Sequence, residues 1–423
     1  MKILWVLNKA IGKMAEEMRL PTDGYGGWLD QSLIEIRESD RISLAFLTSG
    51  NQAETKTIRE GNDIYYMIPG GSAYSSFRDN RKNRAAVKEV IDREKPDLIH
   101  LWGTESALGL LVARLTPNIP KVVYVQGFMN AVKRHYYEST SKKALRRATT
   151  FYDLVKRKTI SKVENSIARK AANETEVLQR SDAIICDSDW CEAVCKAINP
   201  NLRVYRKKLP IDPIFKGTVR QESGSHRIFC ASQYGPFKGF EVLLRAVAMV
   251  KQTYPDVCLA VPGGWNKVPV TLREKLTYDS YSNAMNRLIR KWGLEQNVLN
   301  LGALTRAQMA EQMGKCEVFA QASTVENHSS TMREAMFAGV PCVASAVGST
   351  AEYLQSRASG FLFRNTEPEV LAFYLLKLFA DTDLQRKFGK AGKERIAERY
   401  AEPEPDYPTI YADLAKCGRK AVK

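Results

Sequence analysis

The chain has 423 residues, of which 44% are hydrophobic and 26% are charged. This length suits two domains of about 200 residues each, and the balance of apolar and charged residues excludes a largely disordered protein. Lys and Arg outnumber Asp and Glu by 63 to 47, so the formal net charge is +16 and an anionic partner or substrate is expected.

The N-terminal sequence begins with a short apolar run, from Ile3 to Leu7. It is shorter than the apolar core of a signal peptide, and no later stretch has the length of a membrane span. We therefore expect a cytosolic protein whose first residues form a buried strand. The eight cysteines are scattered without a CxxC pair, which favours reduced thiols and no zinc site.

Short β-branched or aromatic runs alternate with longer helical patterns along the whole chain. The runs that predict strands lie at 3–7, 42–47, 64–67, 98–102, 122–125, 183–186, 228–230, 257–261, 298–301, 318–320 and 341–344. Several are apolar on both faces, as buried parallel strands are. The pattern predicts an α/β fold with parallel sheets covered on both sides.

The strands divide into two groups of about equal size, which predicts two doubly wound, Rossmann-like domains facing each other across a cleft. The prolines at Pro210 and Pro213 continue neither a helix nor a central strand, so the hinge is expected there. We assign residues 1–212 to the first domain and 213–403 to the second. A last helix, at about 404–423, is expected to pack back on the first domain.

Glycines follow the first predicted strand, at Gly24, Gly26 and Gly27, just before Trp28. Glycine lets the backbone come close to a ligand, although the Gly26-Gly27 pair can also form a simple turn.

A second loop, residues 231–240, follows a predicted strand and opens a helix. Lys238 lies at the start of that helix, where the helix dipole disfavours a cation. The position is explained if the lysine contacts a phosphate. The alternative is a plain solvated lysine.

The third motif is ENHSSTMREAM, from Glu326 to Met336. Ser329, Ser330 and Thr331 are natural helix caps, and the exposed amides of a helix start form an anion site. Glu326 precedes the predicted helix, and Glu334 lies about one turn inside it. The alternative is a capped helix with two surface acids.

These motifs together resemble the family-four, or group 1, retaining glycosyltransferases, which have two Rossmann-like domains in the architecture called GT-B. The resemblance covers essentially the whole chain. Among the group it is most similar to the bacterial transferases of capsular and other surface polysaccharides, as seen at Trp102-Gly103-Thr104-Glu105, Gln126-Gly127 and 198–201.

The resemblance implies a role for each matching position, with a nucleotide-sugar as the donor substrate and a saccharide or lipid-linked saccharide as the acceptor. Glu334 would hold the ribose hydroxyls, and Glu326 would contact the transferred sugar. Lys238 would neutralise the leaving diphosphate, and Gly26 and Gly27 would close on it from the other domain. The remaining donor contacts would be Ala303 and Leu304 near the base, and the amides around His328, Ser329, Ser330 and Thr331.

Two positions depart from the family pattern. Gln233 stands where many relatives carry an arginine, so one fewer cation would contact the diphosphate. Gln126 stands where many carry a histidine. A glutamine cannot act as a general base, although it can bind a sugar hydroxyl. The family implies a front-face mechanism in which the leaving phosphate accepts the proton of the acceptor.

Several other residues have two interpretations. Asp187-Ser188-Asp189 looks like a metal-binding motif, but Asp189 and Glu192 fit a capping box at a helix start. We therefore expect an enzyme without cofactor or metal. Trp28, Glu105 and His135 are candidates for contact with the acceptor, although a lone histidine is more often a surface or structural residue.

The segment between Lys133 and Lys170 contains twelve basic residues and three acidic ones. Interleaved apolar residues suit a helix on an anionic membrane surface, such as the inner face of the plasma membrane, where lipid carriers of polysaccharides are found. The alternative is a solvated helical face.

Three other functions compete with glycosyl transfer. A GT-B-like nucleotide-sugar epimerase would have the same donor site without transfer. A nucleic-acid binder is suggested by the charge alone, but no recognised motif or aromatic stacking pattern supports it, so no nucleic acid is expected. A pseudoenzyme is disfavoured because both glutamates and the lysine are present.

Overall fold

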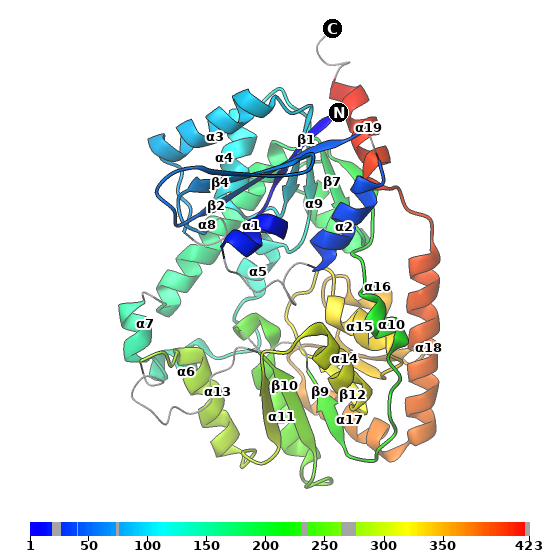
Figure 1. The fold of residues 1–423 in the computed structure, drawn as a ribbon. Coiled ribbons are helices and arrows are strands. Elements are labelled where there is room, and N and C mark those ends of the chain that lie inside the picture. Colours follow the sequence, from blue (N-terminus) through cyan, green and yellow to red (C-terminus); the bar gives the residue numbers. More distant parts are fainter. Residues whose placement is uncertain are drawn as a thin grey trace. The chain divides into compact units, whose positions relative to one another are not determined.

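The computed structural model describes residues 1–18, 27–39, 41–72, 76–156, 158–230, 235–263 and 276–418. The chain divides into two compact units, each with helices on both faces of a sheet (Figure 1). Unit 1 comprises Met1–Asn130, Ile167–Pro210 and Pro403–Lys423, and unit 2 comprises Ala131–Ser166 and Ile211–Glu402.

The sheet of unit 1 has eight strands in the order β3-β4-β2-β1-β5-β6-β7-β8. All neighbouring pairs are parallel except β3 and β4, which form an antiparallel hairpin. The strands are β1 (Lys2–Val6), β2 (Ser43–Gly50), β3 (Lys56–Glu60), β4 (Asp63–Pro69), β5 (Leu98–Trp102), β6 (Lys121–Tyr124), β7 (Ala183–Cys186) and β8 (Arg203–Arg206).

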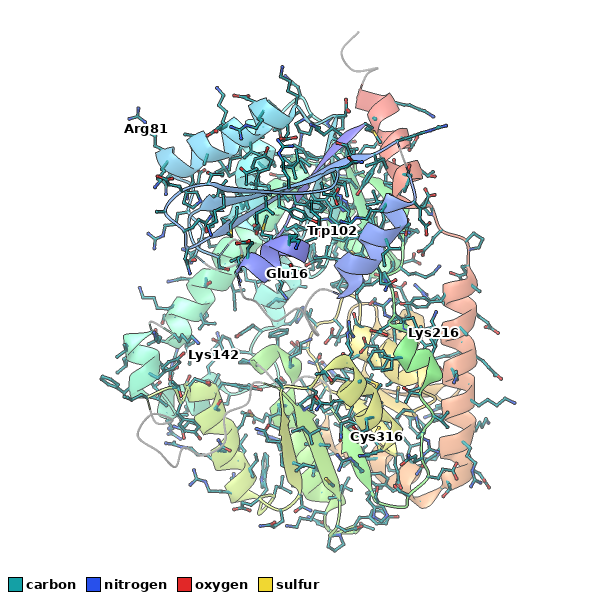
Figure 2. The ribbon with its side chains drawn as sticks, viewed as in Figure 1. Glu16, Arg81, Trp102, Lys142, Lys216 and Cys316 are labelled. Atoms are coloured by element: carbon teal, nitrogen blue, oxygen red, sulfur yellow. The ribbon has the colours of Figure 1, made fainter. Side chains whose placement is uncertain are left out.

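Helices cover both faces of this sheet. They are α1 (Gly12–Glu17), α2 (Gly27–Arg37), α3 (Arg81–Glu94), α4 (Ala107–Leu115), α9 (Asp189–Lys196) and α19 (Tyr407–Gly418), together with α5 (Met129–His135) and α8 (Ile160–Gln179), which continue into unit 2. The last helix, α19, buries Tyr407, Ile410, Tyr411 and Leu414 in the same core as Trp5 and Trp102. Trp102 is labelled in Figure 2.

The sheet of unit 2 has six parallel strands in the order β11-β10-β9-β12-β13-β14. They are β9 (Arg227–Phe229), β10 (Cys258–Pro262), β11 (Val298–Gly302), β12 (Val318–Gln321), β13 (Cys342–Ser345) and β14 (Gly360–Phe363). After β9 the chain adds β10 and β11 on one side of that strand, and it then returns to place β12 on the other side of β9. The direction of winding therefore reverses between β9 and β12.

Two apolar clusters fill the two faces of this sheet. The helices of the unit are α6 (Lys142–Arg147), α7 (Phe151–Val155), α10 (Pro213–Gly217), α11 (Phe240–Val250), α13 (Ser280–Lys291), α14 (Arg306–Gly314), α15 (Ser330–Phe337), α16 (Thr350–Tyr353), α17 (Pro368–Ala380) and α18 (Thr382–Ala401), with a 3-10 turn at Pro236–Lys238.

The predicted division at residue 212 differs from the observed units in one segment. Residues 131–166 precede that boundary, but they pack in unit 2. Leu145 and Ala148 enter a core cluster of unit 2, and Asn283 on α13 donates to the backbone oxygen of Ala148 at 2.8 Å. The segment leaves the first unit because its apolar side chains are buried against α13.

The eleven predicted strands correspond to eleven observed strands, with shifts of at most three residues at their ends. Three strands were missed. All three are edge strands, and β14 is a short, mostly buried strand of four residues that begins at Gly360. The other two, β3 and β8, carry exposed charged residues and therefore lack the continuous apolar run that identifies a central strand. None of the described helices is long and apolar enough to cross a membrane.

We expect Tyr411 to anchor α19 on unit 1. The indole nitrogen of Trp5 donates to its hydroxyl at 3.0 Å, and Nδ1 of His100 lies 2.6 Å from it, both in the core. Tyr411→Phe should cost about 1–3 kcal/mol of unfolding free energy because a buried donor loses its partner. Tyr411→Ala should cost about 3–5 kcal/mol because it also leaves a cavity.

Urea unfolding measures both losses. The matched control is Phe373→Ala on α17, whose side chain is exposed, and which should change stability by less than about 0.5 kcal/mol. Equal stability of Tyr411→Ala and the parent would contradict the packing role of α19.

Candidate functional site

The predicted donor residues of unit 2 gather at the carboxyl edge of its sheet, where the winding reverses. The loop after β9 carries Lys238, and the loop after the neighbouring strand β12 carries Glu326. Open parallel sheets bind ligands at such a reversal, because the connections on the two sides diverge and leave the strand ends uncovered.

Lys238 and Glu326 form an ion pair, with 2.7 Å between Nζ and Oε1. Their side chains are 21% and 13% exposed, so both charges are largely desolvated but still reachable. Ser323 donates a second hydrogen bond to the same carboxylate oxygen at 2.6 Å. The sequence analysis named both residues but not their pairing. The solvated-lysine alternative is wrong for this structure.

Close backbone contacts hold the loops around this pair. Gly239 has a φ of +69°, and a Cβ there would lie 1.8 Å from the carbonyl oxygen of Ala322. Gly348 has a φ of +54°, and a Cβ there would lie 1.8 Å from the carbonyl oxygen of Glu326. Any larger residue would push the loops apart, so glycine is required at both positions.

The start of α15 lies beside the pair, with Ser329 as its N-cap at a left-handed φ of +43°. Its hydroxyl does not cap the helix, which corrects the predicted cap. It contacts Gln321 and Thr350 instead, both at 3.3 Å. His328 and Ser329 are buried, and Ser330 and Thr331, the first residues of the helix, are half-buried. The cap side chain therefore leaves the first amides of α15 available to an anion.

Glu334 lies on the buried face of α15, so the alternative of two surface acids is wrong. Its Oε1 accepts a hydrogen bond from Nη1 of Arg306 at 2.6 Å. Burial raises the pKa of the Glu334 carboxyl, and the Arg306 guanidinium opposes that rise. Sequence reasoning missed Arg306. It is a cation in the first turn of α14, and that unfavourable placement was the available signal.

Ala303 and Leu304 follow β11 and precede Arg306, so they lie in the loop that carries the partner of Glu334. Ala303 is exposed and Leu304 is half-buried. Two other predicted donor residues, Gly26 and Gln233, lie outside the described residues. Gly27 begins α2, and Trp28 follows it in the same helix.

The predicted residues of unit 1 follow β5 and β6. Glu105 is buried, and it accepts hydrogen bonds from Nδ2 of Asn8 at 3.2 Å and from the amide of Thr104 at 3.1 Å. Burial raises the pKa of Glu105, and hydrogen bonds from its own backbone and from Thr104, together with the charge of Lys170, oppose the rise. Gln126 is half-buried beyond β6. Asn8, which follows β1, was missed because a single asparagine after a strand is not distinctive.

His135 ends α5 in the segment that packs in unit 2, and its Nδ1 lies 2.9 Å from the carboxylate of Glu138 at the surface.

The Asp187-Ser188-Asp189 motif starts a helix, but its cap differs from the predicted one. Ser188 is the N-cap and accepts from the amide of Cys191 at 3.1 Å, while Asp189 and Glu192 both pair with Arg206. Within the described ranges, no three His, Cys, Asp or Glu side chains are grouped to hold a metal ion.

Comparison with known proteins identifies the domain that carries this site. Residues 215–395 match the family model of the glycosyl transferases group 1. The match lies within unit 2 and includes Lys238, Glu326 and Glu334, and it agrees with the glycosyltransferase resemblance of the sequence.

Curated relatives agree with this assignment. The chain is 22% identical over 340 residues to the uncharacterized glycosyltransferase YqgM of Bacillus subtilis, with 79% of this chain and 83% of that protein covered. It is 27% identical over 132 residues to N-acetyl-alpha-D-glucosaminyl L-malate synthase of Bacillus anthracis, but that match spans only 31% of this chain and 34% of the relative.

Solved structures confirm the GT-B fold. Sucrose-phosphate synthase from Thermosynechococcus elongatus superposes with a TM-score of 0.68 at 16% identity, over 100% of this chain and 99% of that one. Anabaena HepE, solved in complex with UDP and glucose, gives 0.60 at 17% identity with the same coverage. At these identities the likeness concerns the fold alone.

The Glu334–Arg306 pair generates a prediction about pH. In Arg306→Gln the buried carboxylate loses its cation, so its folded-state pKa rises further above the unfolded value. The protonated Glu334 carboxyl stabilises the folded state of this variant, and that contribution is lost as pH rises through the pKa of the carboxyl in the folded state. The variant should be less stable than the parent by about 1–3 kcal/mol near pH 8, and by less near pH 5.

Urea unfolding across this pH range checks the sign of the effect. The double variant Arg306→Gln/Glu334→Gln has no carboxyl group at position 334. The additional pH dependence of its unfolding free energy should therefore disappear. A deficit in Arg306→Gln that grows on acidification would show that the pair does not control the Glu334 carboxyl.

Proposed function

We propose that the chain is a retaining glycosyltransferase that moves a sugar from a nucleoside-diphosphate donor to a saccharide or lipid-linked saccharide. The observation that carries the proposal is the Lys238–Glu326 pair at the β9–β12 reversal, beside the start of α15. An ammonium, a carboxylate and open helix amides together match a diphosphate linked to a polyhydroxy group.

Each side chain has a chemical task in this proposal. The Lys238 ammonium and the first amides of α15 stabilise the negative charge that grows on the diphosphate as the glycosidic bond breaks. Glu326, freed from Lys238, accepts hydrogen bonds from hydroxyls of the transferred sugar. Glu334 holds the ribose hydroxyls, with Arg306 keeping its carboxyl ionised.

The transfer breaks the bond between the anomeric carbon and the diphosphate oxygen and forms a bond to an acceptor hydroxyl. The acceptor proton passes to the leaving diphosphate. Gln126 cannot take this proton, which is why the proposal assigns it to the leaving group. In unit 1, Glu105 and Gln126 are assigned to contact with acceptor hydroxyls.

We further propose a role in bacterial surface polysaccharide synthesis, at the cytoplasmic face of the plasma membrane. The support is the resemblance at 102–105 and 126–127 and the basic segment between Lys133 and Lys170, whose charge suits an anionic lipid surface.

The proposed activity is tested in two stages. A thermal-shift screen with UDP, GDP, ADP and dTDP should show stabilisation by one nucleotide, since binding to the native state raises its stability. Incubation with the matching nucleotide-sugar, with and without an oligosaccharide acceptor, then identifies the products. A sugar joined to the acceptor supports transfer. An isomerised donor in both reactions would support the epimerase instead.

Lys238→Ala should lower kcat by about a hundredfold with a smaller change in KM, because the lysine acts mainly on charge that develops in the transition state. Lys390→Ala, a lysine of unit 2 whose side chain is 78% exposed, is the matched control and should leave kcat unchanged. Equal kcat for Lys238→Ala and the parent would remove the lysine from the reaction.

Transfer should continue in EDTA. In the proposal, the diphosphate charge is balanced by Lys238 and the helix amides, and Asp187 and Asp189 belong to a helix start. Initial rates with EDTA, and with EDTA followed by excess magnesium, make the comparison. Loss of turnover that magnesium restores would show that a metal carries the diphosphate.

A further inference from the structure

The short helix α7 exposes three large apolar side chains, Phe151, Leu154 and Val155, which are 66%, 60% and 59% accessible. Ten large apolar side chains are exposed among the described residues, and these three lie within five positions. Isolated exposed apolar residues are ordinary, but a contiguous group is typical of an interaction surface. We call these three residues the α7 tip.

Hydrogen bonds fix both ends of the helix that carries the α7 tip. A capping box starts the helix, in which the amide and the hydroxyl of Thr150 both donate to Asp153, at 3.0 and 2.8 Å. Asp153 is buried, and its backbone oxygen accepts from the amide of Lys158 at 2.8 Å. Because the tip residues are spaced i, i+3 and i+4, this helix presents them on one face.

Cations surround the tip. Arg146 and Arg147 precede it on α6, Lys156 and Lys158 follow it, and all four are exposed. Figure 1 shows α6 beside α13 with α7 beyond it, and Lys142 of α6 is labelled in Figure 2. An apolar face with a basic rim is the composition that binds the boundary between headgroups and acyl chains of an anionic bilayer.

The acidic side chains of the same segment do not offset this rim. Glu138 contacts His135 at 2.9 Å, and Glu164 pairs with Lys142 at 2.7 Å. Asp153 is buried within the cap of α7. The charge that the segment presents to a partner is therefore positive.

We propose that the α7 tip is a membrane-insertion element, in which Phe151, Leu154 and Val155 enter the interface of an anionic bilayer while the basic rim contacts lipid phosphates. This deepens the membrane partner of the proposed function and rests on it. A second copy of the chain fits the tip poorly. A two-fold contact would set the basic rim against itself, and a five-residue helix is small beside the area that a stable dimer buries.

The tip belongs to the same packed unit as the donor residues. Within the segment of residues 131–166, Ser139 donates to the backbone oxygen of Pro236 at 3.0 Å, and the ring of Tyr136 stacks on Phe237 at 5.6 Å. Both partners lie in the turn that carries Lys238. A bilayer that binds α7 would therefore be attached, through this segment, to the support of the donor loop.

Co-sedimentation of the full chain with vesicles tests the proposal, using phosphatidylcholine alone and phosphatidylcholine with an equal share of phosphatidylglycerol. The parent should bind the anionic vesicles and bind less in high salt. Phe151→Ser/Leu154→Ser keeps the net charge and removes apolar area that is already exposed, so folding should be unaffected. The partition coefficient of this variant between anionic vesicles and water should fall about tenfold or more.

The matched control is Phe373→Ser, which removes an equally exposed phenylalanine (60%) from α17 of the same unit and should leave binding unchanged. Lys143→Ser/Arg146→Ser/Arg147→Ser reports the contribution of charge alone. Binding is measured without donor, so it succeeds or fails independently of glycosyl transfer.

Three results would overturn the insertion element. One is the absence of binding to anionic vesicles at low salt. Another is a Phe151→Ser/Leu154→Ser variant that binds like the parent while the charge variant does not, which would indicate a purely electrostatic contact. The third is a lipid-free dimer, seen by light scattering, that the tip variant abolishes, because the tip would then be a contact between copies.

Discussion

The short contact between Lys238 and Glu326 is the constraint on which the candidate site depends. Two largely desolvated charges are costly to keep apart, and each neutralises the other in the structure described. A diphosphate that takes the ammonium would leave the Glu326 carboxylate with Ser323 and whatever hydroxyls the ligand supplies. A ligand with only a phosphate would pair with the Lys238 ammonium and leave the Glu326 carboxylate without a partner from the ligand. A ligand that joins a diphosphate to a sugar would offer a partner to both side chains.

The tight loops hold the pair in place. Backbone carbonyls of Ala322 and Glu326 approach Gly239 and Gly348 so closely that no side chain fits. The amide of Thr324 also donates to the carbonyl of Phe237 at 2.8 Å. Positions fixed by backbone contacts do not have to be ordered when a ligand binds, so less of the binding energy is lost in organising the site.

The buried acids of unit 1 follow a different principle. Glu174 on α8 accepts hydrogen bonds from the amides of Met129 and Asn130, each at 2.8 Å, and from the hydroxyl of Thr104 at 2.7 Å. It therefore satisfies the start of α5 and the loop after β5 with one carboxylate, although burial raises its pKa.

The sequence predicted the features that depend on local pattern. Central strands such as β5 are apolar on both faces, and the residues that follow them were named as site candidates for that reason. It could not predict pairings between distant positions. Lys238 and Glu326 are separated by 88 positions, and Arg306 and Glu334 by 28, and no periodicity links such residues. Their proposed roles came from the resemblance to a family, and the geometry then added Arg306 and Asn8.

The placement of residues 131–166 shows why one predicted hinge was too few. The prolines at Pro210 and Pro213 flank a real boundary, between Pro210 and Ile211, but the chain also changes unit after Asn130, Ser166 and Glu402. The crossings after Asn130 and Ser166 lie within helices, where no glycine or proline interrupts the sequence, and the crossing after Glu402 stands next to Pro403. The segment stays with unit 2 because Leu145 is buried there and Ser139 bonds to Pro236. Support for Lys238 thus comes from a part of the chain that is covalently flanked on both sides by unit 1.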